Sequence, residues 1–173
     1  MSAEDLRAKI REIPDFPKPG ILFYDITTLL KDAAAYRESI KLMLDPYRGD
    51  AIDIVIGMES RGFIFSAPMA IELGAGLVPV RKLGKLPAET ISVEYALEYG
   101  SNTLEIHRDA IQPGQKVLIV DDLLATGGTV QGTIELVERL KGDVTGLAFL
   151  VELEFLHGRE RLPGRRVTSV IKY

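Results

Sequence analysis

The amino-acid sequence predicts an α/β fold in which a parallel sheet carries helices on both of its faces. Two stretches of the chain, residues 52–80 and 117–152, each have the order strand, loop, helix and strand. Their first strands, IDIVIG at 52–57 and VLIV at 117–120, are continuous apolar runs, which indicates burial on both faces. Ligands of such sheets bind beyond the carboxyl ends of the strands, so we expect the binding site at the loops MESRG (58–62) and DDLLATGGT (121–129).

The other elements follow from periodicity and from helix signals. We expect an N-terminal helix over 3–13 with Ser2 as N-cap, a proline-rich loop over 14–20 and a second helix over 33–47. The repeated units should contain helices over 63–73, despite Pro68, and over 129–142, and a last strand over 145–152. Residues 81–110 are polar and alternate weakly, which favours a hairpin that leaves the sheet and acts as a lid.

The composition limits the class of protein. A chain of 173 residues, 46% hydrophobic and 27% charged, has the size of one globular domain, so we treat residues 1–173 as a single domain. The net charge of −4 argues against nucleic-acid binding, which usually needs a clustered basic face. No cysteine is present, no apolar run approaches the ~20 residues of a membrane helix, and the N-terminus lacks the apolar part of a secretion signal. We therefore expect a cytosolic protein with a small ligand.

The segment VLIVDDLLATGGT (117–129) indicates what that ligand is. A glycine-rich turn that opens a helix offers backbone N–H groups to an anion such as phosphate. The turn is not a Walker A loop, because Gly128 rather than lysine precedes Thr129, and the middle glycine of a dinucleotide fingerprint is missing. Asp121 and Asp122 can accept hydrogen bonds from sugar hydroxyls while the turn holds an attached phosphate. A phosphorylated sugar is the expected ligand; the alternative is that the acids merely end a strand and the glycines merely turn the chain.

The same segment resembles the phosphoribosyl pyrophosphate motif of the type I phosphoribosyltransferases. Further segments resemble the adenine-specific branch of that family, in the same order: FPKPGILFYDIT (16–27), GMESRGFIFSAPMA (57–70), VPVRKLGKLPAET (78–90), LEYGSNTLEIHRDAI (97–111) and VELEFLHGRERL (151–162). The resemblance implies the type I fold, with a small N-terminal hood over residues 1–32 that binds the base and a flexible lid hairpin over 81–110. It implies the reaction of adenine with phosphoribosyl pyrophosphate to give AMP and pyrophosphate in purine salvage. It further implies a homodimer and Mg²⁺ that arrives with the substrate, without a protein cage.

The resemblance also implies the site residues. Asp121 and Asp122 would hold the ribose hydroxyls, and the 5′-phosphate would bind to Ala125, Thr126, Gly127, Gly128 and Thr129. Pyrophosphate would bind to Arg61, Lys82 and Lys85, because arginine binds phosphate oxygens bidentately and lysine supplies a movable charge. Adenine would lie against Leu22, Phe23 and Tyr24. In the lid Glu98 would act as the acid or base that moves the proton of adenine, and Tyr99 beside it would help closure.

Other readings of these residues remain open from the sequence alone. Lysines of a surface loop are usually only solvated, and Phe23 would more often belong to a core than to a pocket. His107 and His157 lack the spacing of metal ligands.

Two rival functions also stay open. The first is transfer to another base such as hypoxanthine or xanthine, for which the sugar half of the site would look the same. The second is a regulator that binds phosphoribosyl pyrophosphate without catalysis, against which the negative net charge and the retained Arg81, Lys82, Lys85 and Glu98 argue.

Overall fold

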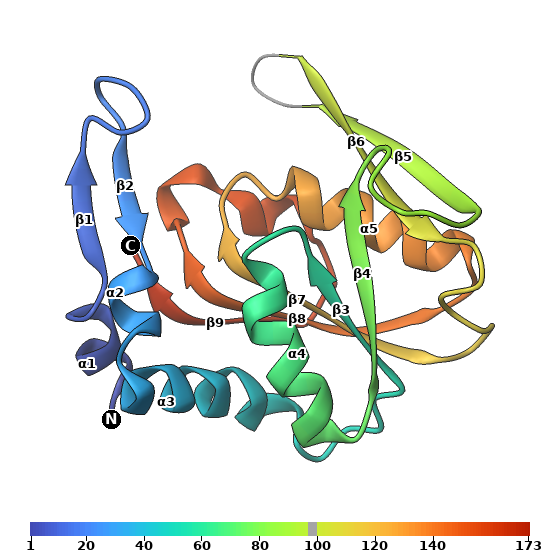
Figure 1. Ribbon diagram of the computed structural model, residues 1–173, viewed down its shortest axis with the longest axis horizontal. Helices are drawn as coiled ribbons and strands as arrows, with labels where there is room; N and C mark the ends of the chain where they lie inside the picture. The colour runs from blue at the N-terminus through green and yellow to red at the C-terminus, as the bar shows by residue number, and fades with distance from the viewer. Residues whose placement is uncertain (97–99) are drawn as a thin grey trace.

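The computed structural model describes residues 1–96 and 100–173, and within them a mixed sheet of seven strands forms the centre of the molecule (Figure 1). The strand order is β5-β6-β4-β3-β7-β8-β9, and the five strands from β4 to β9 are parallel. Their bounds are β3 Ile54–Met58, β4 Gly76–Lys82, β7 Lys116–Leu124, β8 Asp143–Glu152 and β9 Val167–Lys172. The α/β class with a mostly parallel sheet is therefore confirmed.

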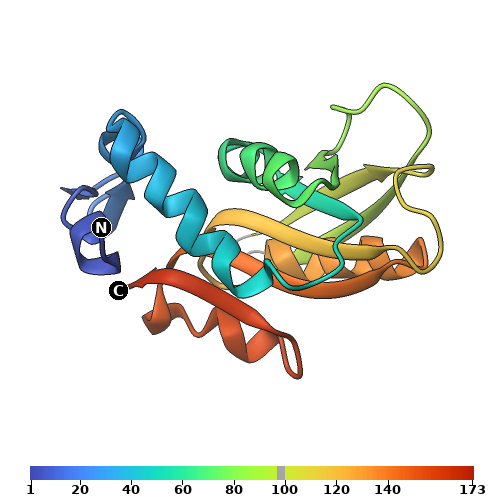
Figure 2. The same cartoon turned by 90° about the horizontal axis from the view of Figure 1, so that it is seen from below.

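Helices cover both faces of the sheet, as the continuous apolar strands predicted. Figure 2 shows α3 (Ala33–Leu44) and α4 (Gly62–Leu73) on one face and α5 (Gly128–Arg139) on the other. Neighbouring strand residues alternate between the two cores: Val55 and Leu118 pack on the α3 and α4 side, whereas Ile56 and Ile119 pack on the α5 side. Every side chain of the central strands thus has apolar neighbours, whichever face it points to.

The N-terminal helix is shorter than predicted. Ser2 caps α1 (Ala3–Arg7) as expected, in a capping box with Asp5, but the predicted helix over 3–13 is wrong beyond residue 7. Residues Arg11–Pro14 form strand β1, which pairs antiparallel with β2 (Leu22–Asp25), and Arg11 forms an ion pair with Asp25 at 2.5 Å. Main-chain pairing with a distant segment overrides the local helix preference here. The short helix α2 (Thr27–Leu30) follows this hairpin.

Pro68 lies inside α4 instead of delaying its start. A proline has no N–H, so the carbonyl of Ile64, four residues earlier, receives no helical hydrogen bond from it. The hydroxyl of Tyr36 in α3 donates to this carbonyl at 2.6 Å. Pro68 therefore leaves free the carbonyl through which Tyr36 joins α3 to α4.

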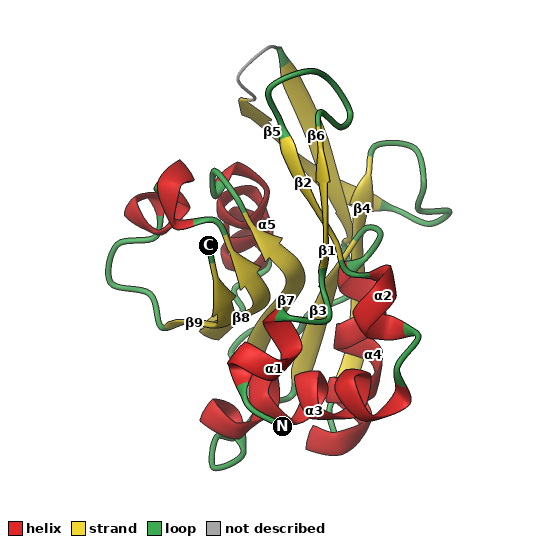
Figure 3. Ribbon diagram, turned by 90° about the vertical axis from the view of Figure 1, so that its left-hand side faces the viewer, coloured by secondary structure: helices red, strands yellow, loops and turns green. Residues whose placement is uncertain are grey.

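The segment after β4 forms an antiparallel hairpin, β5 (Thr90–Ala96) and β6 (Ser101–His107). The expectation that it leaves the sheet is wrong at its base, because β6 pairs with β4 through Arg81 with Glu105 and Lys82 with Leu104. Figures 1 and 3 show that this hairpin and the β1–β2 hairpin project from the same end of the molecule.

The C-terminal part contains two short 3₁₀ helices and a strand that the sequence did not predict. They are η2 (Glu154–Leu156), η3 (Gly158–Arg161) and β9, which adds a parallel edge beyond β8. A further 3₁₀ turn, η1 (Asp45–Tyr47), continues α3, so the predicted helix over 33–47 is confirmed with a tighter last turn. Among the described helices, none has the length and apolar content needed to cross a membrane.

Candidate active site

The glycine turn lies at the carboxyl end of β7 and opens α5. Gly127, with φ of 85°, is the N-cap of this helix, a left-handed conformation that glycine adopts readily. A cavity of about 70 Å³ lies over the turn and is lined by Asp121 and by the five residues Ala125, Thr126, Gly127, Gly128 and Thr129. The first N–H groups of a helix have no acceptor within it, and the helix dipole favours negative charge there. The structure thus brings the predicted phosphate-binding residues around one small cavity.

The two acids lie within β7 rather than after it, because the strand continues to Leu124. The backbone N–H of Asp122 donates to Oδ1 of Asp121 at 2.8 Å, and Oδ2 of Asp122 accepts from Nε of Arg61 at 2.6 Å. Burial, with the neighbouring charge of Asp122 as a second cause, raises the pKa of the Asp121 carboxyl well above its usual range. The site therefore holds two close carboxylates, of which only Asp122 has a cation directly beside it.

Arg61 comes from the loop between β3 and α4, where it is the N-cap residue of α4. That helix begins very close to β7: a Cβ on Gly62 would lie 2.8 Å from Oδ1 of Asp121 and 3.1 Å from the carbonyl oxygen of Val120. A glycine at this position lets the start of α4 approach the acids. Two helix N-termini, those of α4 and α5, thus lie at the same end of β7.

A second cavity, of about 190 Å³, adjoins the acids on the side of the N-terminal hairpin. Its lining includes Leu22, Phe23 and Tyr24 together with Arg61 and Asp122. The guanidinium carbon of Arg61 is 5.7 Å from the centre of the Phe23 ring, and Tyr24 packs on Tyr173 with 3.9 Å between ring centres. Phe23 is half-buried in a cavity wall, so the alternative that it belongs to the core does not hold.

The loop that carries Lys82 and Lys85 is held by carboxylates that the sequence did not single out. Glu59 accepts from the backbone N–H of Lys82 at 2.9 Å and from Arg81 at 3.2 Å. The hydrogen bond from Lys82 is the main reason that the pKa of Glu59 is lowered, with Arg81 adding to the effect. Glu105 accepts from the N–H of Gly84 and Lys85. Both lysine side chains are exposed at this edge, while their backbone is fixed.

Neither acid gave a clear signal in the sequence. Glu59 stands in a loop, and Glu105 falls in the alternating run TLEIH, where it resembles an ordinary outward-facing strand residue. Glu98, the predicted acid or base, and Tyr99, predicted to help closure, lie outside the described residues. Within the part of the chain that is described, no three His, Asp or Glu side chains are grouped as metal ligands.

Comparison with known proteins identifies the family. A model of the phosphoribosyl transferase domain matches residues 25–167. The adenine phosphoribosyltransferase of Chloroflexus aurantiacus is 58% identical over 173 residues, which cover 100% of both chains. The crystal structure of the adenine phosphoribosyltransferase of Thermoanaerobacter pseudethanolicus has a TM-score of 0.96 and 55% identity, covering 99% of this chain and 100% of that chain. The Saccharomyces cerevisiae enzyme, crystallised with adenine and an imino-altritol bisphosphate, has a TM-score of 0.91 and 40% identity, with 97% of each chain covered. The phosphate loop, the acids of β7 and the adjoining cavity thus occur in a chain that belongs to the phosphoribosyltransferase family.

Proposed function

We propose that this protein is an adenine phosphoribosyltransferase, which joins adenine to the ribose of phosphoribosyl pyrophosphate and gives AMP and pyrophosphate. The observation that carries the proposal is the position of two consecutive acids between two cavities. Asp121 lines the cavity over the phosphate loop, and Asp122 lines the cavity formed by Leu22, Phe23 and Tyr24. A ribose held by these acids would have its 5′-phosphate in the first cavity and its anomeric carbon toward the second. The relatives that share this fold support adenine as the base.

Each part of the site has a task in that reaction. The carboxylates of Asp121 and Asp122 accept hydrogen bonds from the ribose hydroxyls, and the N–H groups of residues 125–129 bind the 5′-phosphate. Displacement at the anomeric carbon builds positive charge on the sugar and negative charge on the leaving pyrophosphate. Arg61 follows the end of β3 and Lys82 ends β4, with Lys85 in the loop beyond, so these cations would be available to neutralise the pyrophosphate. The ring of Phe23 offers a face on which a planar base can stack.

Mg²⁺ is part of this proposal. The ion would arrive with the substrate and keep several waters, so the carboxylates of Asp121 and Asp122 would stay with the ribose hydroxyls. When bound, the ion neutralises charge on the pyrophosphate group.

The roles of Glu98 and Tyr99 are also proposed, on the family resemblance. Neutral adenine must lose a proton as its nitrogen attacks, and a carboxylate of the lid can accept it. We expect Glu98→Gln to lower kcat while leaving both KM values within about twofold. An unchanged kcat would remove Glu98 from the mechanism.

We further propose a homodimer in the cytosol. Among the described residues, Ile71 in α4 is 81% exposed, Leu77 in β4 is 47% exposed and Leu83 just after β4 is 62% exposed. A second copy of the chain would cover these side chains if they lay in one contiguous interface. Sedimentation equilibrium would give the mass of the assembly, and cell fractionation would give the location.

The reaction is tested by measuring pyrophosphate release with Mg²⁺ and phosphoribosyl pyrophosphate while adenine, hypoxanthine, guanine and xanthine are offered separately. We expect turnover with adenine, and a loss of about 100-fold or more in kcat/KM for Asp122→Asn. Turnover only with another base would retain the sugar site and reject adenine. Tight binding of phosphoribosyl pyrophosphate without turnover on any base would favour the regulator.

A further inference from the structure

The 3₁₀ helix η3 lies directly against the phosphate loop, although the two are far apart in the sequence. A Cβ on Gly127 would lie 2.6 Å from the carbonyl oxygen of Gly158. A Cβ on Gly158 would overlap the carbonyl oxygen of Ala125 and lie 3.1 Å from the backbone nitrogen of Gly127. The atoms in contact are backbone atoms on both sides, which cannot move aside as a flexible side chain can. The contact therefore requires a residue without a side chain at position 158.

The segment that contains Gly158 is anchored independently of the loop. Arg159 donates to both carboxylate oxygens of Glu152 at 2.9 and 2.5 Å and to the carbonyl of Val167 at 2.9 Å. Glu152 is 4% exposed and also accepts from Ser169 in β9. These bonds join η3 to the ends of β8 and β9. An atom added at position 158 would therefore displace the phosphate loop more readily than η3.

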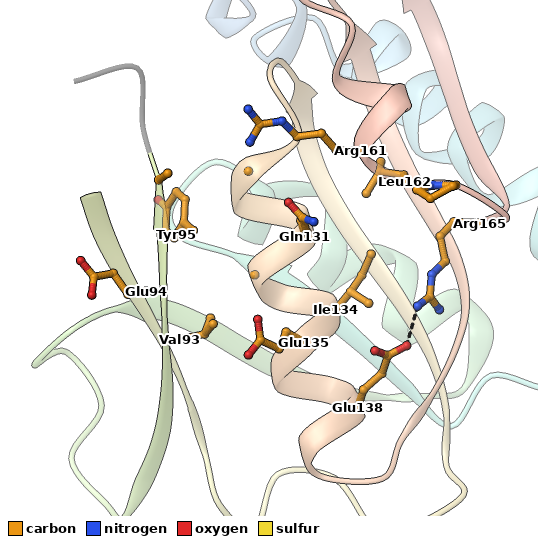
Figure 4. Close-up of a pocket in the computed structure, with 14 residues that line it drawn as sticks. Val93, Glu94, Tyr95, Gln131, Ile134, Glu135, Glu138, Arg161, Leu162 and Arg165 are labelled. Atoms are coloured by element: carbon orange, nitrogen blue, oxygen red, sulfur yellow. Dashed lines mark hydrogen bonds and ion pairs between the residues drawn. The ribbon is translucent and has the colours of Figure 1, made fainter. Parts of the chain in front are cut away.

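The same segment continues along the loop to the start of α5. Nη1 of Arg161 lies 3.7 Å from the position of a Cβ on Gly128. Figure 4 shows the Arg161 side chain extending toward the first turn of α5, in a hollow of about 530 Å³ between β5, α5 and η3. The loop thus has η3 along its outer side from Ala125 to Gly128.

We propose that Gly158 is a positioning residue for the 5′-phosphate. Its backbone fixes Ala125 and Gly127, so that the N–H groups of the loop point to one place. The proposal rests on the proposed function, because it assigns the loop to the phosphate of phosphoribosyl pyrophosphate. On this proposal Gly158, in the C-terminal segment, supports the phosphate site although it does not itself contact the substrate.

The test compares Gly158→Ala with Gly49→Ala. A Cβ on Gly49 would meet no atom within 4 Å and its φ is not positive, so this control adds the same methyl group where space is open. We expect Gly158→Ala to raise the KM for phosphoribosyl pyrophosphate, and the Kd for ribose 5-phosphate measured by calorimetry, by about 10- to 100-fold. The KM for adenine should change by less than about twofold, because its cavity does not include this loop. The control should match the wild type in all three constants.

A second variant covers the case in which Gly158→Ala does not fold. Arg159→Lys retains the charge but lacks the planar fork that donates to both oxygens of Glu152, so the support of η3 weakens without added bulk in the loop. We expect a smaller rise, about threefold, in the Kd for ribose 5-phosphate with an unchanged KM for adenine. Equal changes for both substrates, or a lower Tm with unchanged ribose 5-phosphate binding, would overturn the proposal. If the wild type bound ribose 5-phosphate but did not turn over, the proposed reaction would fail, and the binding data would still decide the role of Gly158.

Discussion

Asp121 combines a binding role with a cost to stability. Its pKa is raised by burial and by the charge of Asp122, so the folded protein favours the neutral form of this carboxyl more than the unfolded chain does. When the pKa of a group is higher in the folded protein than in the unfolded chain, its contribution to stability is greatest below the pKa of the unfolded chain. That contribution is lost as the pH rises through the pKa of the folded protein. Above the folded pKa, the buried charge destabilises the free protein. A ligand with hydroxyl donors would compensate for this charge.

We predict that Asp121→Asn stabilises the free protein at neutral pH. The amide oxygen can still accept from the N–H of Asp122, and no charge has to be buried. The variant should have a higher Tm than the wild type at pH 7, and the difference should shrink toward about pH 3, which lies below the unfolded pKa of about 3.9, so that the wild-type carboxyl is protonated in both states. Phosphoribosyl pyrophosphate should bind more weakly. Thermal unfolding across this pH range checks the prediction, and a lower Tm at pH 7 would contradict it.

Glu105 is a second carboxylate whose importance only the fold reveals. It is 3% exposed, and it accepts from Gly84 N at 2.6 Å, Lys85 N at 3.2 Å and the Thr90 hydroxyl at 3.1 Å. These bonds hold the loop on which Lys85 stands. The charge of this lysine is therefore presented from a supported backbone.

We predict that Glu105→Leu weakens pyrophosphate binding more than Glu105→Gln does. Leucine leaves two N–H donors without their acceptor, which costs about 2 kcal/mol and frees the loop. Glutamine retains one acceptor oxygen and serves as the matched control. The Kd for pyrophosphate should rise about tenfold for the leucine variant and about twofold for the glutamine variant. Equal affinities in titration calorimetry would show that Glu105 does not support the loop.

At the level of elements, the contact between the β5–β6 hairpin and α5 depends on a glycine face of the helix. Gly128 and Gly132 are one helical turn apart and both lie toward β5. A Cβ on Gly132 would lie 3.3 Å from Cγ1 of Val93 and 3.6 Å from Cδ1 of Leu104. The hairpin therefore packs almost directly on the helix backbone beside the phosphate loop.

A large side chain at position 132 should separate the hairpin from α5. We predict that Gly132→Leu lowers the free energy of unfolding by about 2 kcal/mol through overpacking. Gly132→Ala is the control: its single methyl group meets side-chain rather than backbone atoms, and alanine favours the helix by about 1 kcal/mol, so the net change should be within about 1 kcal/mol. Urea denaturation measures both. Equal free energies of unfolding for the two variants would contradict the prediction, because they would show that the larger side chain does not overpack this contact.

At the level of the whole molecule, the C-terminal segment is joined to the sheet by the ion pair of Glu152 and Arg159. The hydrogen bonds from Arg159, followed by that from Ser169, lower the pKa of Glu152 despite its burial. A carboxylate with a lowered folded pKa contributes stability that is present above its unfolded pKa and is lost as the pH falls through the folded value. Acidification should therefore weaken this connection.

We predict that the wild type loses stability from about pH 5 downward, and that Glu152→Gln loses less over the same range because it has no carboxylate at this position to protonate. At pH 7 the variant should be less stable by about 2 kcal/mol, since Arg159 loses its partner. Glu154→Gln is the matched control, as its pair with Lys172 is half-exposed on both sides and contributes little. Denaturant unfolding between pH 3 and pH 7 measures the free energy of unfolding of each variant. The prediction is contradicted if this free energy falls with decreasing pH as steeply for Glu152→Gln as for the wild type.

The sequence by itself determined the two strand-loop-helix units and the chemistry of the glycine turn. Val130, Ile134 and Val137 of the predicted helix over 129–142 are buried on the inner face of α5, and Asp121 lines one cavity together with the turn. These features depend on residues close together in the chain, so periodicity and turn chemistry are sufficient to predict them.

Only the tertiary structure decided the features that depend on distant partners. Residues 11–14 form a strand because residues 22–25 pair with them, and β9 exists because β8 offers an open edge. Glu105 and Gly158 support the site because the fold places them against loops far from them in the sequence. Local propensities differ by about 1 kcal/mol or less per residue, which main-chain pairing and close backbone packing readily outweigh, so no local pattern could have predicted these contacts.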